Sequence, residues 1–326
     1  MPQPQPAVFD VFNGDADGLC ALHQLRLAQP KASSLITGVK RDIGLLQQVP
    51  LQAGIEVNVC DISLDVNIDA LQALLQAGAT VSYFDHHAAS KQPAHPALHS
   101  YIDESPEVCS SMLVDRHLQG QYRPWAIAAA FGDNLSAPAS ALAQSIGLSA
   151  GQTAQLQELG TLLNYNAYGE SVADLAIAPA ALYQALTPYA SPFDFIAEAQ
   201  AFRLLRDNYA ADNARLGQLQ PLRQMPHAAV YLLPPEKWAR RISGILANRL
   251  ASAQPQQAFA ILNLDSAGDY LISVRAPKGS AVGAVGLCSQ YPSGGGRFAA
   301  GGINHLPAEQ RDDFIQRFFD YFAPLD

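Results

Sequence analysis

The sequence predicts an α/β fold: an N-terminal, mostly parallel sheet flanked by helices, followed by a smaller C-terminal α/β domain. Three observations support this prediction. Short β-like runs alternate with helical runs in the first half, a second alternation begins after Pro226, and 326 residues are enough for two domains. Alternation of this kind is typical of parallel sheets that are covered on both faces.

In the first half, the first expected strand is AVFDVF (7–12), and the turn NGDADG leads from it into a helix over 19–28. The second strand, IEVNVC (55–60), precedes an amphipathic helix over 69–77 with leucines at positions 71, 74 and 75. TVSYF (80–84) is the third strand, and the chain from 125 to about 190 is rich in Ala and Leu and is expected to be helical. Ligands of such sheets bind outside the carboxyl ends of the strands, where acidic residues stand in this chain.

The second half is expected to begin after a charged helical segment at 193–219. We place the domain boundary between 191 and 225, which gives domains 1–190 and 226–326 and a helical linker over 191–225. In the second domain we expect strands at 228–233, 259–264 and 270–275 and helices at 238–250 and 307–322. A glycine-rich loop is expected at 294–302.

Composition and charge restrict the class of protein. The formal net charge of -9 argues against binding of long nucleic acid, which usually requires a basic surface. Four cysteines without a Cys-x-x-Cys pair argue against a disulfide framework and a structural zinc site. The N-terminus does not show the order of a signal peptide, and no apolar run approaches the ~18 residues of a membrane span. A cytoplasmic location without a membrane partner is therefore expected.

Two acidic motifs follow the first two strands. Asp15 and Asp17 lie two residues apart in a strand-to-helix turn, from which each carboxylate could reach one of two neighbouring cations. The alternative is an acidic N-cap with a second acidic residue that complements the helix dipole. Asp61 ends the second strand and could equally be a turn residue.

Two further motifs contain candidate ligands. Asp85, His86 and His87 leave the third strand together and offer imidazole nitrogens for a metal and a donor for a phosphate, or else they form a hydrogen-bonded loop. Asp133 follows an apolar helical run, where an unpaired buried carboxylate would be costly. It either lies in a helix C-terminal turn open to water or binds a cation.

Taken together, the stretches NGDADG, VCDIS, FDHH and AFGDN, in this order and each after an apolar element, resemble the DHH phosphoesterases. SSMLVDR (110–116) matches the helix that usually follows the Asp-His-His motif of that family. In the second half, ISVR (272–275) and GGGRFAAGG (294–302) resemble the DHHA1 substrate-binding domain with its triple-glycine loop. The resemblance covers nearly the whole chain.

The resemblance implies two divalent cations, usually manganese. By this correspondence Asp15 would hold one cation, a second group of residues would hold the other, and Asp61 would bridge them. The second group consists of Asp17, His86 and Asp133. Asp85 would orient His86 as a hydrogen-bond acceptor, and His87 would contact the scissile phosphate. The reaction implied is attack of a metal-activated water on phosphorus.

Two positions differ from the pattern of the family. Asn13 stands where many relatives carry His or Asp, and Arg297 stands where His is frequent. An arginine can form bidentate contacts to a phosphate or to a guanine edge. The expected substrate contacts are His87, Arg275, Gly294, Gly295, Gly296 and Arg297, whereas Arg240 and Arg241 are expected to be surface charges.

The function that these inferences favour is hydrolysis of a short linear dinucleotide, such as pGpG or pApA, to mononucleotides. Alternatives with the same site are a nucleoside bisphosphate phosphatase, an exopolyphosphatase or an enzyme that trims the end of single-stranded DNA. The last would call for a basic groove with stacking aromatic residues. An alternative of another class is a non-catalytic nucleotide-binding regulator. The sequence leaves the oligomeric state open, a homodimer included.

Overall fold

The computed structural model describes residues 7–324. The chain divides into two compact units, one that runs through Ala167 and includes Ser171–Asp207, and another that consists of Tyr168–Glu170 and the chain from Asn208 onward. The segment expected to be a helical linker holds α8 (Pro192–Glu198), α9 (Gln200–Leu216) and the short strand β6 (Arg223–Met225). Helix α9 contributes residues to both units.

The first unit is built on a sheet of five strands in the order β2-β1-β3-β4-β5. Every neighbouring pair in it is parallel, so the expected parallel sheet is confirmed. The strands are β1 (Val8–Phe12), β2 (Ser34–Thr37), β3 (Glu56–Cys60), β4 (Thr80–Asp85) and β5 (Leu98–Ile102).

The two edge strands, β2 and β5, are absent from the sequence-based prediction. Each pairs with one neighbour only, and their residues are mostly half-buried or exposed. An edge strand tolerates polar side chains on both faces, so LHSYI and SLIT lack the continuous apolar character of a central parallel strand.

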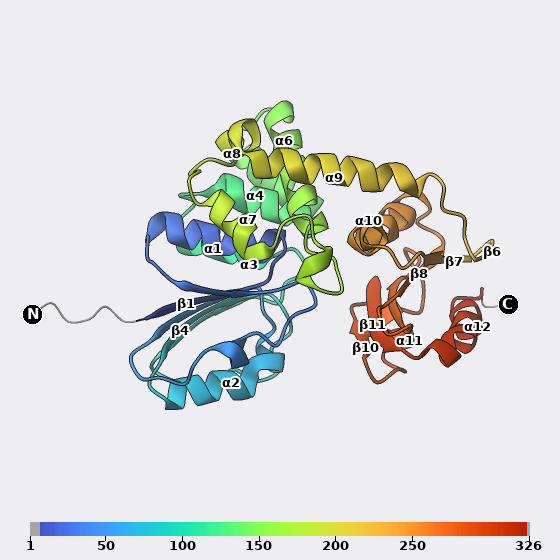
Figure 1. Cartoon of the computed structure of the whole chain (residues 1–326), viewed down its shortest axis with the longest axis horizontal. Helices are drawn as coiled ribbons and strands as arrows, with labels where there is room; N and C mark the ends of the chain where they lie inside the picture. Colours follow the sequence, from blue (N-terminus) through green and yellow to red (C-terminus); the bar gives the residue numbers. More distant parts are fainter. Residues whose placement is uncertain (1–6, 325–326) are drawn as a thin grey trace, which may run out of the picture. The chain divides into compact units, whose positions relative to one another are not determined.

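Helices cover both faces of this sheet (Figure 1). Helix α2 (Leu64–Gln76) lies on one face, where its leucines pack with buried valines of β1, β3 and β4. On the other face lie α1 (Ala16–Ala28) and α3 (Ser110–His117), against which α4 (Arg123–Gly132) packs. The remaining elements of the unit are α5 (Ser136–Ser145), α6 (Ala150–Tyr165), α7 (Pro179–Leu186), η1 (Leu46–Gln48) and η2 (Val172–Asp174).

Helices α1, α4 and α6 approach one another closely through glycines. A Cβ on Gly160 would lie 2.0 Å from the Ala128 carbonyl oxygen, and one on Gly132 would lie 2.4 Å from the Ala16 Cβ. Both distances are far below van der Waals contact, so only glycine fits at these two positions. The close packing fixes the C-terminal end of α4, and Asp133 is the residue that follows it.

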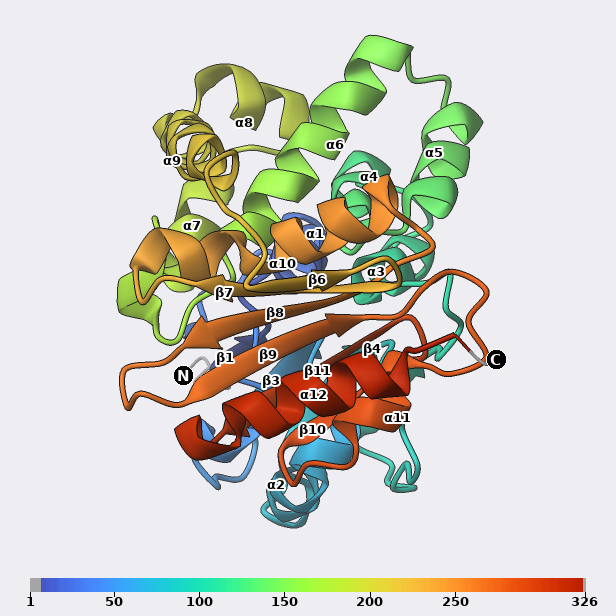
Figure 2. The ribbon, with the colours of Figure 1, turned by 90° about the vertical axis from the view of Figure 1, so that its right-hand side faces the viewer.

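The second unit contains a mixed sheet in the order β10-β11-β9-β8-β7-β6, which agrees with the predicted C-terminal α/β domain. Its further strands are β7 (Ala228–Leu233), β8 (Ala258–Leu264), β9 (Tyr270–Arg275), β10 (Gly294–Gly296) and β11 (Ala300–Leu306). Helix α10 (Lys237–Ala253) covers one face, and α11 (Ala284–Cys288) and α12 (Arg311–Tyr321) cover the other (Figure 2). A short helix, η3 (Ala308–Gln310), precedes α12.

The glycine-rich segment expected to be a loop is a β-hairpin instead. Gly294, Gly295 and Gly296 pair antiparallel with Ile303, Gly302 and Gly301. The glycines allow close packing, since a Cβ on Gly294 would lie 1.8 Å from the Cys288 carbonyl oxygen at the end of α11. Because glycine-rich stretches are depleted in strands, residue propensity predicts a loop here, and tertiary packing overrides it.

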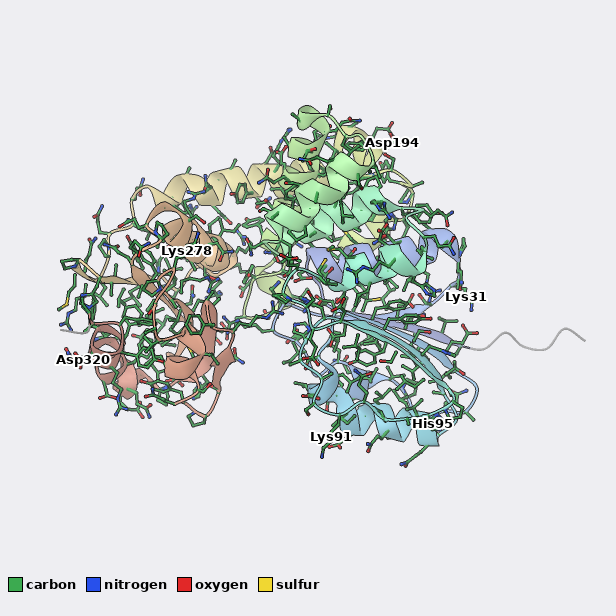
Figure 3. The ribbon with its side chains drawn as sticks, turned by 180° about the vertical axis from the view of Figure 1, so that it is seen from behind. Lys31, Lys91, His95, Asp194, Lys278 and Asp320 are labelled. Carbon is green, nitrogen blue, oxygen red and sulfur yellow. The ribbon has the colours of Figure 1, made fainter. Side chains whose placement is uncertain are left out.

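Charged side chains lie on the surface of both units. Figure 3 labels Lys91 and Asp194 on the first unit and Lys278 and Asp320 on the second, and all four are exposed. Within residues 7–324 there is no helix with the length and apolar character needed to cross a bilayer.

Candidate active site

The carboxyl ends of β1, β3 and β4 lie level with one another. Phe12 of β1 is in register with Cys60 of β3, and Cys60 is in register with Phe84 of β4. The residues that follow these strands therefore meet at one edge of the sheet. These residues include the turn that contains Asp15 and Asp17, then Asp61, and the Asp85-His86-His87 motif.

Asp15 is the N-cap of α1. Its Oδ1 accepts hydrogen bonds from the backbone amides of Asp17 at 3.0 Å and Gly18 at 3.1 Å, as the N-cap interpretation requires. Its Oδ2 forms an ion pair with the ammonium group of Lys40. Burial opposes ionisation of Asp15, but the Lys40 charge together with the hydrogen bonds from Lys40 and Gly18 lowers the pKa of Asp15.

Asp17 points toward the N-terminus of α3. Its two carboxylate oxygens accept hydrogen bonds from the backbone amides of Ser110 and Ser111, both at 2.7 Å. Burial, followed by the nearby charge of Asp61, raises the pKa of Asp17 to about 7. A cation bound next to the Asp17 carboxylate would stabilise its ionised form.

Asp61 has a left-handed backbone conformation, with φ 61°. Asp and Asn adopt this conformation more readily than most residues. The Asp61 Oδ1 accepts a hydrogen bond from the Ser110 hydroxyl at 3.1 Å and lies 3.4 Å from the His86 Nε2. Burial and the neighbouring Asp15 raise the pKa of Asp61.

The His86 ring is held so that its Nε2 faces three carboxylates. Its Nδ1 lies 2.9 Å from the Val108 carbonyl oxygen, which accepts the hydrogen bond. The Nε2 lies 3.4 Å from Asp61, 3.8 Å from Asp133 and 3.9 Å from Asp17. Burial opposes protonation of this ring, but the acidic neighbours, Asp61 foremost, raise the pKa of His86 to about 10.

Asp85 contacts His87 and not the His86 ring. Its Oδ1 lies 2.6 Å from the His87 Nδ1 and also accepts the His86 backbone amide at 2.9 Å. The expectation that Asp85 orients the His86 ring is therefore wrong. The reason is that the Val108 carbonyl oxygen, just before α3, already accepts the hydrogen bond from the His86 Nδ1.

The two histidines differ in accessibility. The His87 side chain is 38% exposed, whereas that of His86 is 5% exposed. Burial opposes protonation of His87, but the hydrogen bond to Asp85 and the charges of Asp61 and Asp85 together raise the pKa of His87. His87 is thus the more accessible histidine of the pair.

The donor set fits a divalent cation. The ligand atoms of Asp17, His86 and Asp133 lie within 4.8 Å of one another, and the same holds for Asp61, His86 and His87. Carboxylate oxygens with imidazole nitrogen are suitable ligands for manganese and similar ions. Among residues 7–324, no group of three potential ligands with this spacing contains Asp15.

Lys40 and Asn164 belong to the site but are absent from the sequence-based prediction. The Lys40 Nζ donates to the Asn164 Oδ1 at 3.1 Å and lies 3.9 Å from Asp133, in addition to its ion pair with Asp15. Neither residue stands in a local motif, since Lys40 follows an edge strand and Asn164 is near the end of α6. Only the fold brings Lys40 to Asp15 and Asn164 to Lys40.

The expected substrate residues of the second unit have different environments. Arg275 ends β9, and its guanidinium donates to the Asn248 side chain and the Val274 carbonyl, both at 3.0 Å. Burial lowers the pKa of Arg275. Arg297 is exposed at the tip of the β10–β11 hairpin, next to Phe298, whose ring is 54% exposed. Sequence reasoning did not identify Phe298.

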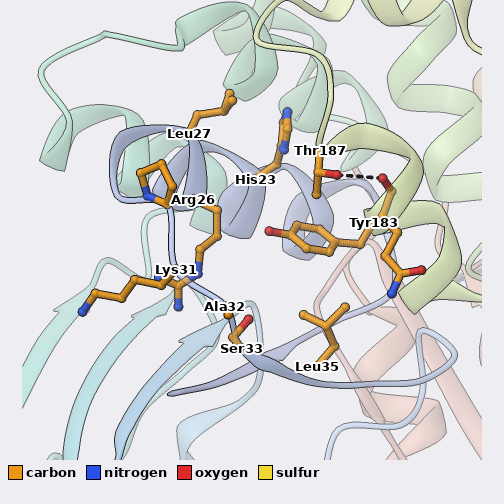
Figure 4. Close-up of a pocket in the computed structure, with 11 residues that line it drawn as sticks. His23, Arg26, Leu27, Lys31, Ala32, Ser33, Leu35, Tyr183 and Thr187 are labelled. Carbon is orange, nitrogen blue, oxygen red and sulfur yellow. Dashed lines mark hydrogen bonds between the residues drawn. The ribbon is translucent and has the colours of Figure 1, made fainter. Parts of the chain in front are cut away.

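A pocket of about 600 Å³ in the first unit lies around the C-terminal half of α1 (Figure 4). Its cationic side chains are already paired: Arg26 with Asp10 and Lys31 with Glu56. The ring of His23 contacts the Tyr189 carbonyl oxygen at 2.9 Å, and burial lowers the pKa of His23 to about 4. We therefore assign the chemistry to the acidic group at the N-terminal end of α1.

The chain has the fold of the DHH phosphoesterases, as its motifs imply. The acidic and histidine residues at the level strand ends agree with this class of fold. Three similar solved structures have TM-scores of 0.64, 0.55 and 0.53. They are the exonuclease RecJ bound to manganese, the pGpG-specific phosphodiesterase PggH from Vibrio cholerae and an exopolyphosphatase-related protein from Bacteroides fragilis.

The structural matches cover nearly the whole of this chain and of each of the three other chains. The sequence identities are 20%, 14% and 12%, and the matches cover 99%, 97% and 98% of this chain. They cover 91%, 98% and 92% of the three other chains in the same order. No family model and no curated protein matches the sequence. The likeness therefore concerns the fold.

Proposed function

We propose that the protein is a divalent-cation-dependent phosphodiesterase that hydrolyses short linear nucleotides, such as pGpG or pApA, to mononucleotides. The observation that carries this proposal is the convergence of Asp17, Asp133 and the His86 Nε2 at the carboxyl edge of a parallel sheet, with Asp61 beside them. The cation would be held by these residues. When bound, it would polarise a phosphate oxygen and lower the pKa of a water molecule.

The residues around the cation have separate tasks in this proposal. The Val108 carbonyl fixes the tautomer of His86, because an Nδ1 that donates leaves the Nε2 lone pair free for a metal. Asp85 accepts a hydrogen bond from the His87 Nδ1 and favours the protonated ring, whose Nε2 can then donate a hydrogen bond to a phosphate oxygen. The charge that develops on that oxygen in the transition state would be stabilised by a donor that is already in place.

The second unit is proposed to hold the part of the substrate that does not react. Arg275, Arg297 and the glycines at 294–296 are the candidate contacts. The guanidinium groups can bind a terminal phosphate or a guanine edge, and the exposed Phe298 ring offers a surface on which a base can stack. An acidic chain with a net charge of -9 favours a short substrate over a long one.

An exonuclease that acts on single-stranded DNA is the second candidate, because the fold resembles that of RecJ with a TM-score of 0.64. A nucleoside bisphosphate phosphatase and an exopolyphosphatase remain alternatives with the same catalytic residues. In the non-catalytic alternative the site would bind nucleotide without cleaving it. All four differ from the leading proposal in the product that they form or fail to form.

A single screen distinguishes these functions. The purified protein is incubated with pGpG, pApA, a nucleoside 3′,5′-bisphosphate, polyphosphate and a ten-nucleotide DNA strand, with Mn2+ or Mg2+, and products are identified by mass spectrometry. We expect mononucleotides from the dinucleotides, and no product after chelation of the metal. Asp61→Asn is the inactive control, because the variant loses the carboxylate charge. Asparagine also adopts the left-handed backbone conformation readily, so the fold should be retained. Binding without product in every case would support the regulator and contradict our proposal.

A further inference from the structure

We propose that the Lys40 ammonium group takes the place of one of two cations, so that the site binds a single divalent cation tightly. This inference rests on the proposed function, since it assumes that the group of Asp17, His86 and Asp133 binds metal. It differs from the two-cation arrangement that the sequence motifs imply. The difference is located at Asp15, the residue expected to hold the first cation.

Asp15 differs from Asp17 in its cationic partner: the oxygens of Asp17 accept backbone amides, whereas Asp15 forms an ion pair with Lys40. The Asp15 Oδ1 accepts two backbone amides at the start of α1, and its Oδ2 is paired with the Lys40 Nζ. A divalent cation bound to Asp15 would lie next to this ammonium group, and two positive charges at such a separation repel each other strongly in a buried site. The carboxylate of Asp15 is therefore matched to a monovalent cation that the chain itself supplies.

The position of Lys40 is fixed by its backbone. Its amide donates to the Ala167 carbonyl at 2.9 Å, and its carbonyl accepts a hydrogen bond from the Asn13 side chain at 3.3 Å. The turn that contains Lys40 is closed by Asp42, whose carboxylate accepts the Val39 amide at 3.0 Å.

Two glycines bring this turn close to Asp15. A Cβ on Gly14 would lie 2.2 Å from the Gly38 carbonyl oxygen, and a Cβ on Gly38 would lie 2.1 Å from the Asp42 side chain. The turn that carries Lys40 therefore lies directly against the turn that carries Asp15.

Asn13 and Asn164 complete the environment of the ammonium group. The Asn13 Oδ1 accepts the Asp15 amide at 3.3 Å, so both ends of the Asn13 amide join the Asp15 turn to the Lys40 turn. The Asn164 Oδ1 accepts from the Lys40 Nζ at 3.1 Å, and Asn164 is 6% exposed. Asp15 and Asn164, with Asp133 at 3.9 Å, thus surround the Nζ with oxygen atoms.

The role proposed for Lys40 is electrostatic. Its charge would neutralise Asp15 and act on a phosphate bound beside the cation. An ammonium group offers a fixed charge whose presence does not depend on the concentration of free metal.

The test is the number of bound cations in the full-length protein. Mn2+ is titrated into the chelator-treated protein by calorimetry, and the loaded sample is measured by electron paramagnetic resonance. We expect the wild type to bind one equivalent tightly and to give the six-line signal of an isolated Mn2+ ion. Lys40→Met should bind a second equivalent on the order of 100-fold or more tightly than the wild type does, with an exchange-coupled signal.

Two further variants separate charge from shape. Lys40→Arg keeps the positive charge and should retain a stoichiometry of one. Asp15→Asn should also leave the stoichiometry and affinity of the tight cation unchanged, whereas a site with two cations would lose one of them. Lys31→Met is the matched control, because Lys31 pairs with Glu56 on the surface of the same unit.

Several outcomes would overturn the inference. Two tightly bound, exchange-coupled ions in the wild type would show that Lys40 does not replace a cation. The same single equivalent in the wild type and in a folded Lys40→Met variant would show that Lys40 is not what excludes the second ion. Absence of any bound Mn2+ in all variants would contradict the proposed function itself, so the two failures are distinguishable.

Discussion

His86 and His87 are neighbours in the sequence, but their rings have different partners and different accessibility. His86 is buried and directs its Nε2 at three carboxylates, whereas His87 is more exposed and is held by Asp85. A carboxylate beside an imidazole fixes its orientation and raises its basicity. We therefore propose that His86 binds the metal and that His87 contacts the phosphate.

We expect His86→Ala to lower the Mn2+ content strongly, because the variant loses a nitrogen ligand. His87→Ala should retain the metal content of the parent and lower the rate of hydrolysis by on the order of 100-fold or more, as loss of a transition-state donor does. Metal analysis after gel filtration and a hydrolysis assay measure the two effects. Equal loss of metal in both variants would contradict this division of roles.

At the scale of elements, close packing of α4 on α6 positions Asp133. A side chain on Gly160 would meet the carbonyl oxygen of Ala128 on α4, which is backbone that cannot rotate away. Gly151 lies in the first turn of the same helix, and the nearest atom to a Cβ there is the Ser149 hydroxyl at 4.0 Å. One helix therefore provides both a test position and its control.

Gly160→Ala should lower the free energy of unfolding by about 1–3 kcal/mol, since overpacking forces the helices apart. It should also weaken Mn2+ binding, because α4 carries Asp133 away from His86. Gly151→Ala should leave metal binding unchanged and raise the stability by up to about 1 kcal/mol through the better helix propensity of alanine. Thermal unfolding and Mn2+ titration of both variants check this, and identical behaviour would refute the packing argument.

At the scale of the whole molecule, the buried carboxylates make the stability of the metal-free protein depend on pH. The pKa of Asp17 rises from 3.8 to about 7 on folding, and that of His86 rises from 6.5 to about 10. In both cases the folded state binds protons that the unfolded state has released, so stability falls as the pH rises from about 4 to 10. Asp15, whose pKa is lowered, contributes in the opposite sense only below its ordinary value of 3.8.

We expect the melting temperature of the chelator-treated protein to fall between pH 5 and pH 8, because the loss of the Asp17 proton costs on the order of 3 kcal/mol over this interval. Mn2+ should raise the melting temperature more at pH 8 than at pH 5, since protons compete with the metal for Asp17 and His86. Differential scanning calorimetry with and without metal measures both effects. Asp17→Asn should flatten the pH dependence, and an unchanged slope would disprove the assignment.

At the same scale, the proposed preference for a dinucleotide is tested at Arg297 of the second unit. Arg297→Ala should weaken hydrolysis of a dinucleotide by about 1.5–3 kcal/mol, typical of a hydrogen bond to a charged group. Cleavage of a nitrophenyl phosphodiester should stay nearly unchanged, because that substrate has no second nucleotide for Arg297 to bind. Both substrates are compared in one buffer at fixed metal concentration.

Two results would contradict this prediction. Equal loss of both activities in Arg297→Ala would mean that Arg297 supports the fold or the metal. Parent enzyme that degrades a ten-nucleotide strand as fast as a dinucleotide would favour the exonuclease.

The sequence alone is enough to predict the parallel sheet, its central strands and the acidic residues at their ends. The reason is that these features depend on local patterns: apolar runs predict β1, β3 and β4, and a residue that directly follows a parallel strand must lie at its carboxyl edge. Asp61 and the Asp85-His86-His87 motif are found in this way.

Tertiary structure decides what these residues contact. Lys40 reaches Asp15 across 25 positions of the chain and Asn164 reaches Lys40 across 124, and no spacing in the sequence signals either approach. The Val108 carbonyl accepts the hydrogen bond of the His86 ring, and Asp85 pairs with His87 instead. This pairing depends on side-chain orientation and not on residue type. Packing against α11 likewise makes the glycine-rich segment a hairpin. Periodicity and strand order are local properties, whereas ion pairs and hydrogen bonds between distant segments exist only once the chain has folded.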